Sequence, residues 1–121
     1  MELKRKTLND ALQKLVGTPL VSVDFVEDYM QLEWEKSFLT AHTMPILLIA
    51  GVEYREDDND YRSAMYRLEG QRLRKAEVVE GEALNLFFAN ETLFTISLRD
   101  ADYITAEAFL YRDGDGQLWV A

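Results

Sequence analysis

Two stretches of this chain decide its fold: LNDALQKLVG at residues 8–17 and YRSAMYRLEG at residues 61–70. Aligning the second stretch on the first superposes four pairs of chemically similar residues: Ala11 with Ala64, Leu12 with Met65, Leu15 with Leu68, and Gly17 with Gly70. The agreement continues along the chain as far as Leu39 and Leu93. A repeat of this length constrains the architecture strongly, because each copy forms one unit of supersecondary structure.

Each copy begins with a predicted helix, at residues 8–16 and 61–69. In both helices, apolar residues recur at helical spacing and indicate one buried face. Thr7 is the predicted N-cap of the first helix, and Asn59 or Asp60 is that of the second. Gly17 and Gly70 are placed to end the two helices in a left-handed backbone conformation, which glycine adopts without strain.

Alternating apolar and polar residues predict several strands after each helix. They are residues 21–26, 29–35, 38–44 and 46–50 in the first half, and 73–79, 83–89, 92–98, 106–111 and 117–120 in the second. Neither half could bury both its helix and one face of its strands alone. We therefore expect an α+β protein built from two duplicated α-β-β-β units. A pseudo-twofold axis would relate them in one antiparallel sheet or a half-open barrel packed with two helices.

The chain of 121 residues, with 48% hydrophobic and 29% charged residues, has the size and composition of a single globular domain. The repeat halves span about 7–52 and 60–121. The most polar segment, EYREDDND at residues 53–60, is the predicted acidic joint between them. There is no βαβ rhythm and no glycine-rich turn, which argues against a doubly wound nucleotide-binding fold.

Charge and residue usage exclude several classes of function. The 22 acidic residues outnumber the 13 Lys and Arg residues, for a net charge of -9. Nucleic-acid binding needs a cationic face, so no nucleic-acid partner is expected. No apolar run reaches the length that spans a bilayer, so no membrane partner is expected either. The lack of cysteine excludes disulfides and thiolate metal sites, and it fits a cytoplasmic protein.

His42 is the only histidine, and it lies on a predicted strand face with Thr40. In the repeat register it falls opposite Ile96, a predicted core position. Two interpretations stay open: a partly buried histidine in a core slot, or a base or pH-sensitive group in a small polar pocket. No serine carries a nucleophile-elbow pattern, so no catalytic residue is predicted.

Acidic residues gather at the first predicted hairpin, and they complete the set of candidate binding residues. That set is His42, Thr40, Asp24, Glu27 and Asp28. Paired carboxylates can serve as acid and base, but strand alternation directs Glu33 and Glu35 to solvent. The acidic run at residues 56–60 is contiguous, so its side chains splay apart and cannot enclose calcium. No metal and no cofactor are expected.

The segment VSVDFVEDYMQLEWEKSFLTAHTMP carries a V-x-F-V-x-D-Y-x-x-L strand pair followed by an L-T-A-x-x-x-P return. Over residues 17–45 the chain resembles small uncharacterised bacterial α+β domains of unknown function. The resemblance implies a bacterial protein of the same fold class. It carries over no activity and no catalytic or binding residues.

Three functions follow as hypotheses. The first is a non-enzymatic binding domain that forms a homodimer and has a protein partner, because Phe87 gives one strand aromatic bulk on both faces. The second is an immunity protein that neutralises a toxin through its acidic surface. The third is a small ligand-binding or enzymatic barrel that uses His42.

Overall fold

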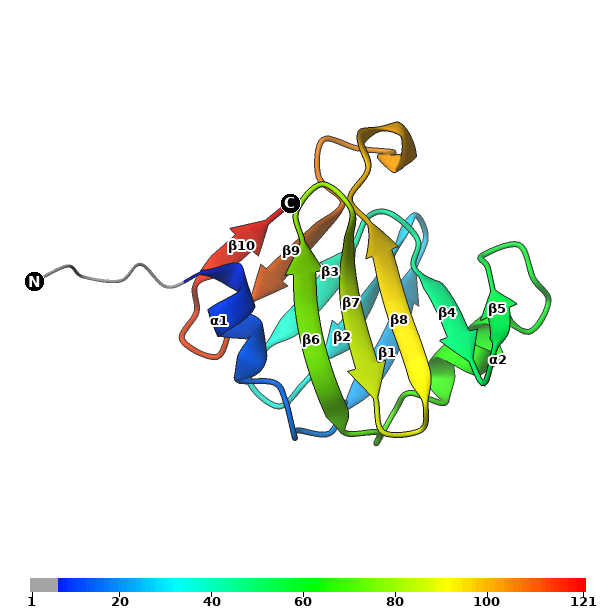
Figure 1. Ribbon diagram of the computed structural model, residues 1–121, viewed down its shortest axis with the longest axis horizontal. Coiled ribbons are helices and arrows are strands. Elements are labelled where there is room, and N and C mark those ends of the chain that lie inside the picture. The colour runs from blue at the N-terminus through cyan, green and yellow to red at the C-terminus, as the bar shows by residue number, and fades with distance from the viewer. Residues whose placement is uncertain (1–6) are drawn as a thin grey trace, which may run out of the picture.

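The computed structural model describes residues 7–121, and it shows an α+β protein with two five-stranded antiparallel sheets (Figure 1). The first sheet has the order β1-β2-β3-β9-β10, with β1 Ser22–Val26, β2 Tyr29–Glu33, β3 Phe38–Ala41, β9 Phe109–Arg112 and β10 Leu118–Val120. The second has the order β5-β4-β8-β7-β6, with β5 Val52–Tyr54, β4 Ile46–Ile49, β8 Thr92–Ser97, β7 Ala83–Phe88 and β6 Leu73–Val79. The predicted α+β class with antiparallel strands is confirmed, and two sheets take the place of the single sheet that was one of the two expected arrangements.

Each sheet combines strands from both halves of the chain. After β3 the chain leaves the first sheet and enters the second as β4 and β5. After β8 it returns to the first sheet as β9 and β10, through a loop that contains the 3₁₀ helix η1 (Asp100–Asp102). Because of these two crossovers, neither sheet is complete without strands from the other half.

The two helices, α1 (Leu8–Gln13) and α2 (Tyr61–Tyr66), begin where the sequence predicts and end three residues early. Thr7 caps α1: its Oγ1 accepts from the Asp10 N–H, and the Asp10 carboxylate accepts from the Thr7 N–H. Asp60 holds the N-cap position of α2 without a side-chain hydrogen bond. Within residues 7–121, neither helix is long and apolar enough to cross a membrane.

The two glycines close the helices and also join the sheets. Gly17 and Gly70 both have positive φ, at 90° and 84°. The Gly17 N–H donates to the Leu73 carbonyl, and the Gly70 N–H donates to the Leu20 carbonyl, both at 2.7 Å. The helices end earlier because the turn before each glycine tightens: the Leu15 N–H donates to the Leu12 carbonyl, and the Leu68 N–H donates to the Met65 carbonyl.

The core fills the space between the two sheets, because each strand directs alternate side chains inward. Strand β7 illustrates the pattern with Leu84, Leu86 and Phe88 buried. The largest fully buried side chains are Tyr61, Tyr111, Phe88, Phe94 and Phe109. Burying an aromatic or aliphatic side chain of this size stabilises the fold by roughly 1.5–3 kcal/mol.

Two local predictions are corrected. Glu53 and Tyr54, placed by the sequence in the acidic joint, belong to β5, because Val52–Tyr54 pairs with Ile49–Leu47. The turn between β2 and β3 has Glu35 and Lys36 at its tip, one residue before the gap at 36–37 between the predicted strands, since the Trp34 N–H donates to the Ser37 carbonyl.

Candidate functional site

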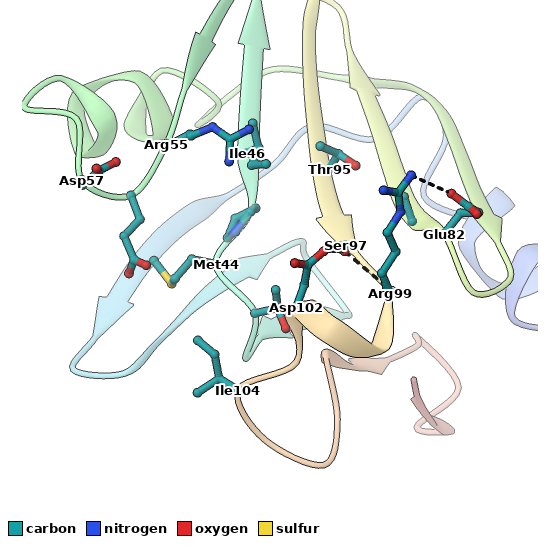
Figure 2. Close-up of a pocket in the computed structure, with 14 residues that line it drawn as sticks. Met44, Ile46, Arg55, Asp57, Glu82, Thr95, Ser97, Arg99, Asp102 and Ile104 are labelled. Carbon is teal, nitrogen blue, oxygen red and sulfur yellow. Dashed lines mark hydrogen bonds and ion pairs between the residues drawn. The ribbon is translucent and has the colours of Figure 1, made fainter.

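An open groove of about 920 Å³ lies at one end of the second sheet, and Figure 2 shows the side chains that line it. One wall is the crossover between β3 and β4, which carries Met44 and Pro45. A second wall is the loop after β5, and the third is the loop after β8, which includes η1. The groove is therefore assembled from four separate parts of the chain around the outer face of β7 and β8.

The floor consists of small side chains on the outer face of the sheet. Ala83 and Ser97 face each other across β7 and β8, and Thr95 lies two residues before Ser97. Thr95 Oγ1 donates to Asn85 Oδ1 at 2.7 Å. Because these side chains are short, they leave the space above the strands empty.

A hydrogen-bonded pair joins the floor to η1. Ser97 Oγ donates to Asp102 Oδ2 at 2.5 Å, and it accepts from the Arg99 N–H at 3.2 Å. This bond orients the exposed Asp102 carboxylate toward Ser97, as Figure 2 shows. The hydroxyl of Ser97 is thus engaged as both donor and acceptor, which leaves it poorly placed to act as a nucleophile.

Two arginines stand on opposite sides of the groove (Figure 2), and each is paired with a glutamate. Arg55 binds both oxygens of Glu53 at 3.2 Å. Arg99 Nη2 lies 3.1 Å from Glu82 Oε2. All four side chains are at least half exposed, so each pair contributes at most about 1 kcal/mol to stability.

Carboxylates outnumber cations among the lining residues. Glu56, Asp57, Glu82 and Asp102 face two guanidinium groups, those of Arg55 and Arg99. Arg99 pairs with Glu82, which lines the groove. Arg55 pairs with Glu53, which does not line it. Within residues 7–121, Glu56 and Asp57 have no ion-pair partner. The groove therefore presents a net negative charge to an incoming ligand.

Tyr61, the first residue of α2, fixes the crossover wall. Its hydroxyl donates to the Pro45 carbonyl at 2.5 Å, and its side chain is only 2% exposed. Burial raises the pKa of the Tyr61 phenol far above its ordinary range, and the nearby negative charge of Glu56 adds to the shift. The phenol is thus a neutral donor at every ordinary pH and holds the wall in place.

Thr43 adds an unsatisfied polar group to the same wall. Its side chain is 7% exposed and lines the groove, and its buried Oγ1 has no hydrogen-bond partner in the described part of the chain. A buried hydroxyl without a hydrogen-bond partner costs free energy. A ligand that forms a hydrogen bond with this hydroxyl would remove that cost.

The sequence-predicted site residues gather elsewhere, on the outer face of the first sheet. Asp24, Gln31 and Thr40 form one row across β1, β2 and β3, and Thr40 Oγ1 lies 3.4 Å from Gln31 Oε1. His42 follows β3 on the same face, and its ring centroid lies 5.9 Å from that of Tyr29. His42 is half-buried, whereas Ile96 is fully buried, so His42 occupies no core slot.

Glu27 and Asp28 form the turn between β1 and β2, and Glu27 has a positive φ of 31°. All five predicted residues thus lie on or beside the outer face of one sheet, and none of them lines the groove. The groove residues were missed because they come from loops and from a strand face of small polar residues. Neither feature has a sequence signal of its own.

The groove combines carboxylates, hydroxyls and apolar side chains such as Met44 and Ile104. No histidine is among its lining residues, and in residues 7–121 no group of three His, Asp or Glu side chains could hold a metal ion. Comparisons with protein-family models, curated proteins and solved structures gave no match to this chain.

Proposed function

We propose that this protein is a non-enzymatic binding domain whose groove holds a basic segment of a protein partner. The observation that carries the proposal is the excess of carboxylates in an open groove of about 920 Å³. Glu56 and Asp57 belong to the loop after β5, and Asp102 belongs to the loop after β8 on the other side of the groove (Figure 2 shows Asp57 and Asp102). A lysine or arginine side chain between them would meet negative charge on both sides.

The charge of the whole chain supports the same partner. A net charge of -9 attracts cationic molecules over long range and accelerates their encounter with the protein. The paired arginines limit this attraction locally, because Arg55 and Arg99 would repel a cation that enters beside them. The groove thus favours a segment that combines basic residues with neutral or acidic ones.

A labelled oligo-arginine peptide tests the proposal by fluorescence anisotropy at low salt. Glu56→Gln with Asp57→Asn removes two groove charges from side chains that make no ion pair. We expect roughly three- to tenfold weaker binding, since exposed charge pairs contribute about 0.2–1 kcal/mol each. The matched control, Asp24→Asn with Glu27→Gln, removes the same charge from the first sheet. Equal weakening by both pairs would mean that the peptide responds only to net charge.

The acidic groove also favours a more specific candidate, an immunity protein that neutralises a toxin with a basic surface. A toxin gene immediately upstream of this gene would support it, and the lack of such a gene across relatives would refute it. The remaining alternative, a ligand-binding or enzymatic barrel that uses His42, has less support, because His42 does not line the groove.

We further propose that the protein is a cytoplasmic homodimer. The support for self-association is the edge strand β10, whose Leu118 and Val120 side chains are 56% and 54% exposed. An edge strand with exposed apolar side chains can pair with a second copy. Light scattering tests this: a species of twice the chain mass is expected, and Leu118→Lys should return it to the mass of one chain. A monomeric wild type at all concentrations would exclude the dimer.

Finally, we infer that the fold is a duplication with a pseudo-twofold axis. The support is the matching strand order, β1-β2-β3-β9-β10 against β6-β7-β8-β4-β5. The reciprocal glycine bonds, from Gly17 to Leu73 and from Gly70 to Leu20, support it further. Superposing the two halves of an experimental structure tests the inference, and strands that fail to overlay would overturn it.

A further inference from the structure

A second pocket, separate from the groove, lies between the end of α1 and the turns that join β2 to β3 and β9 to β10. Its volume is about 430 Å³, and its apolar lining is Leu15, Pro19, Val21, Trp34 and Tyr111. None of these residues lines the groove, so the two sites can be tested independently. The size and lining are those of a site for a small molecule.

Trp34 carries an unsatisfied polar group at this pocket. The side chain is only 5% exposed, and its buried indole N–H has no hydrogen-bond partner within residues 7–121. Buried polar groups in folded proteins nearly always have partners, so such an exception requires an explanation. An acceptor atom on a molecule bound in the pocket would explain the unpaired indole N–H.

Packing alone does not require the indole N–H at this position. In the aligned second half, the residue that corresponds to Trp34 is Phe88, which is buried and has no polar atom. The other tryptophan, Trp119, has a satisfied indole: its Nε1 donates to Asp113 Oδ2 at 3.1 Å. Trp34 is therefore a donor in excess of what the fold itself uses.

Charged side chains surround the pocket without satisfying the indole. Lys14 Nζ and Asp115 Oδ2 form an ion pair at 3.0 Å. Lys36, exposed in the turn beside Trp34, has no ion-pair partner within the described residues. Glu35 lines the pocket beside Lys36, so two lysines and two carboxylates surround it and their charges balance.

We propose that this pocket binds a small, mainly apolar molecule whose carbonyl or carboxylate oxygen accepts the Trp34 indole N–H. The apolar body of the ligand would contact Leu15, Pro19 and Tyr111. The oxygen would supply the acceptor that the protein lacks. This proposal goes beyond the groove function and does not depend on it.

The two tryptophans make the test direct, because the ¹⁵N–¹H spectrum of the protein contains two indole signals. Trp34→Phe assigns them, and the probes are acetophenone, benzoate and toluene. Acetophenone or benzoate should shift the Trp34 signal downfield and saturably, while the Trp119 signal stays in place. Whichever of the two binds more tightly identifies the oxygen as carbonyl or carboxylate. Toluene, which lacks an acceptor, should bind about tenfold more weakly, the effect of one lost hydrogen bond.

Two variants test whether the Trp34 indole N–H contributes to binding of the probe. Trp34→Phe should keep the fold, since phenylalanine occupies the aligned position, and should weaken binding of the oxygen-bearing probe about tenfold. Trp119→Phe should leave that binding unchanged. Unweakened binding to Trp34→Phe, or equal binding of toluene by the wild type, would overturn the proposal. A Trp34 signal that no probe shifts would overturn it as well.

Discussion

The outer ends of the two sheets have the same strand framework and different surfaces. In the first sheet Thr40 pairs with Gln31, and in the second Thr95 pairs with Asn85. In the next row the first sheet carries the rings of His42 and Tyr29, whereas the second carries Ser97 and Ala83. The rings cover the strands of the first sheet, and the small side chains leave the second sheet hollow.

The size of two side chains therefore decides where a site can form. The strands supply the same backbone in both places, and acidic loop residues lie beside both, Glu27 and Asp28 at the first sheet and Glu56 and Asp57 at the second. The sequence directs attention to His42 because histidine is chemically versatile. The structure instead directs attention to Ala83 and Ser97, because a site first needs space.

The largest expected effect on stability comes from substituting Tyr61, which holds the crossover wall beside the groove. Tyr61→Phe leaves the Pro45 carbonyl without its donor, and we expect a loss of about 1–3 kcal/mol in the free energy of unfolding. Urea denaturation measures this change. The control is Tyr66→Phe, an exposed residue of the same helix, which should stay within about 0.5 kcal/mol.

The pH dependence of the free energy of unfolding, compared between the wild type and Tyr61→Phe, provides a second measurement. The folded pKa of Tyr61 is raised, so its stabilising contribution is complete below the unfolded value of about 10 and is lost as the pH rises toward the folded value. The stability difference between wild type and Tyr61→Phe should therefore narrow above about pH 10. A difference that stays constant into strongly alkaline solution would contradict the assignment of Tyr61 as a neutral donor.

Placing the two rings of the first sheet on the second sheet tests whether small side chains keep the groove open. Ala83→Tyr with Ser97→His gives the second sheet the side chains of the first, and should fill the groove. We expect binding of the oligo-arginine peptide to weaken at least about tenfold, or about 1.4 kcal/mol. Ala83→Ser with Ser97→Thr keeps the side chains small and should bind as the wild type does. Unchanged peptide binding by the ring-bearing variant would place the peptide elsewhere.

A smaller effect separates the two threonine pairs. The bond from Thr95 to Asn85 is 2.7 Å long, whereas that from Thr40 to Gln31 is 3.4 Å. Thr95→Val should cost about 1 kcal/mol, and Thr40→Val about half of that or less, because a long hydrogen bond contributes little. Thermal or urea unfolding of the two variants compares them directly. A larger loss of unfolding free energy in Thr40→Val than in Thr95→Val would contradict this prediction.

The smallest effect is expected for His42. His42→Leu keeps an apolar contact with Tyr29 at a half-buried position, so the free energy of unfolding should change by about 0.5 kcal/mol or less. Peptide binding should not change, since His42 does not line the groove. A clear loss of binding, measured by the same anisotropy assay, would return His42 to the functional site.

Much of the secondary structure could be predicted, because its signals are local. The cap at Thr7, the glycine ends of both helices and most strands follow from spacing and turn residues within a few positions. Strand β5 could not be predicted, since the Val52–Tyr54 stretch pairs with β4 through its backbone while its side chains stay polar or exposed. His42 lies on the same strand face as Thr40, and only its alignment with Ile96 is off by one residue, because the turn between β7 and β8 is one residue longer than the turn between β2 and β3.

Local periodicity sets most of the helices and strands of this protein and the faces that they bury. Only the tertiary structure decided which sheet each strand joins, because the crossovers after β3 and β8 depend on packing between both halves. It alone brought Arg55, Ser97 and Asp102 to one groove, and it alone left the Trp34 indole beside a pocket without an acceptor. Periodicity reports on neighbours along the chain, whereas space and missing partners are properties of the folded whole.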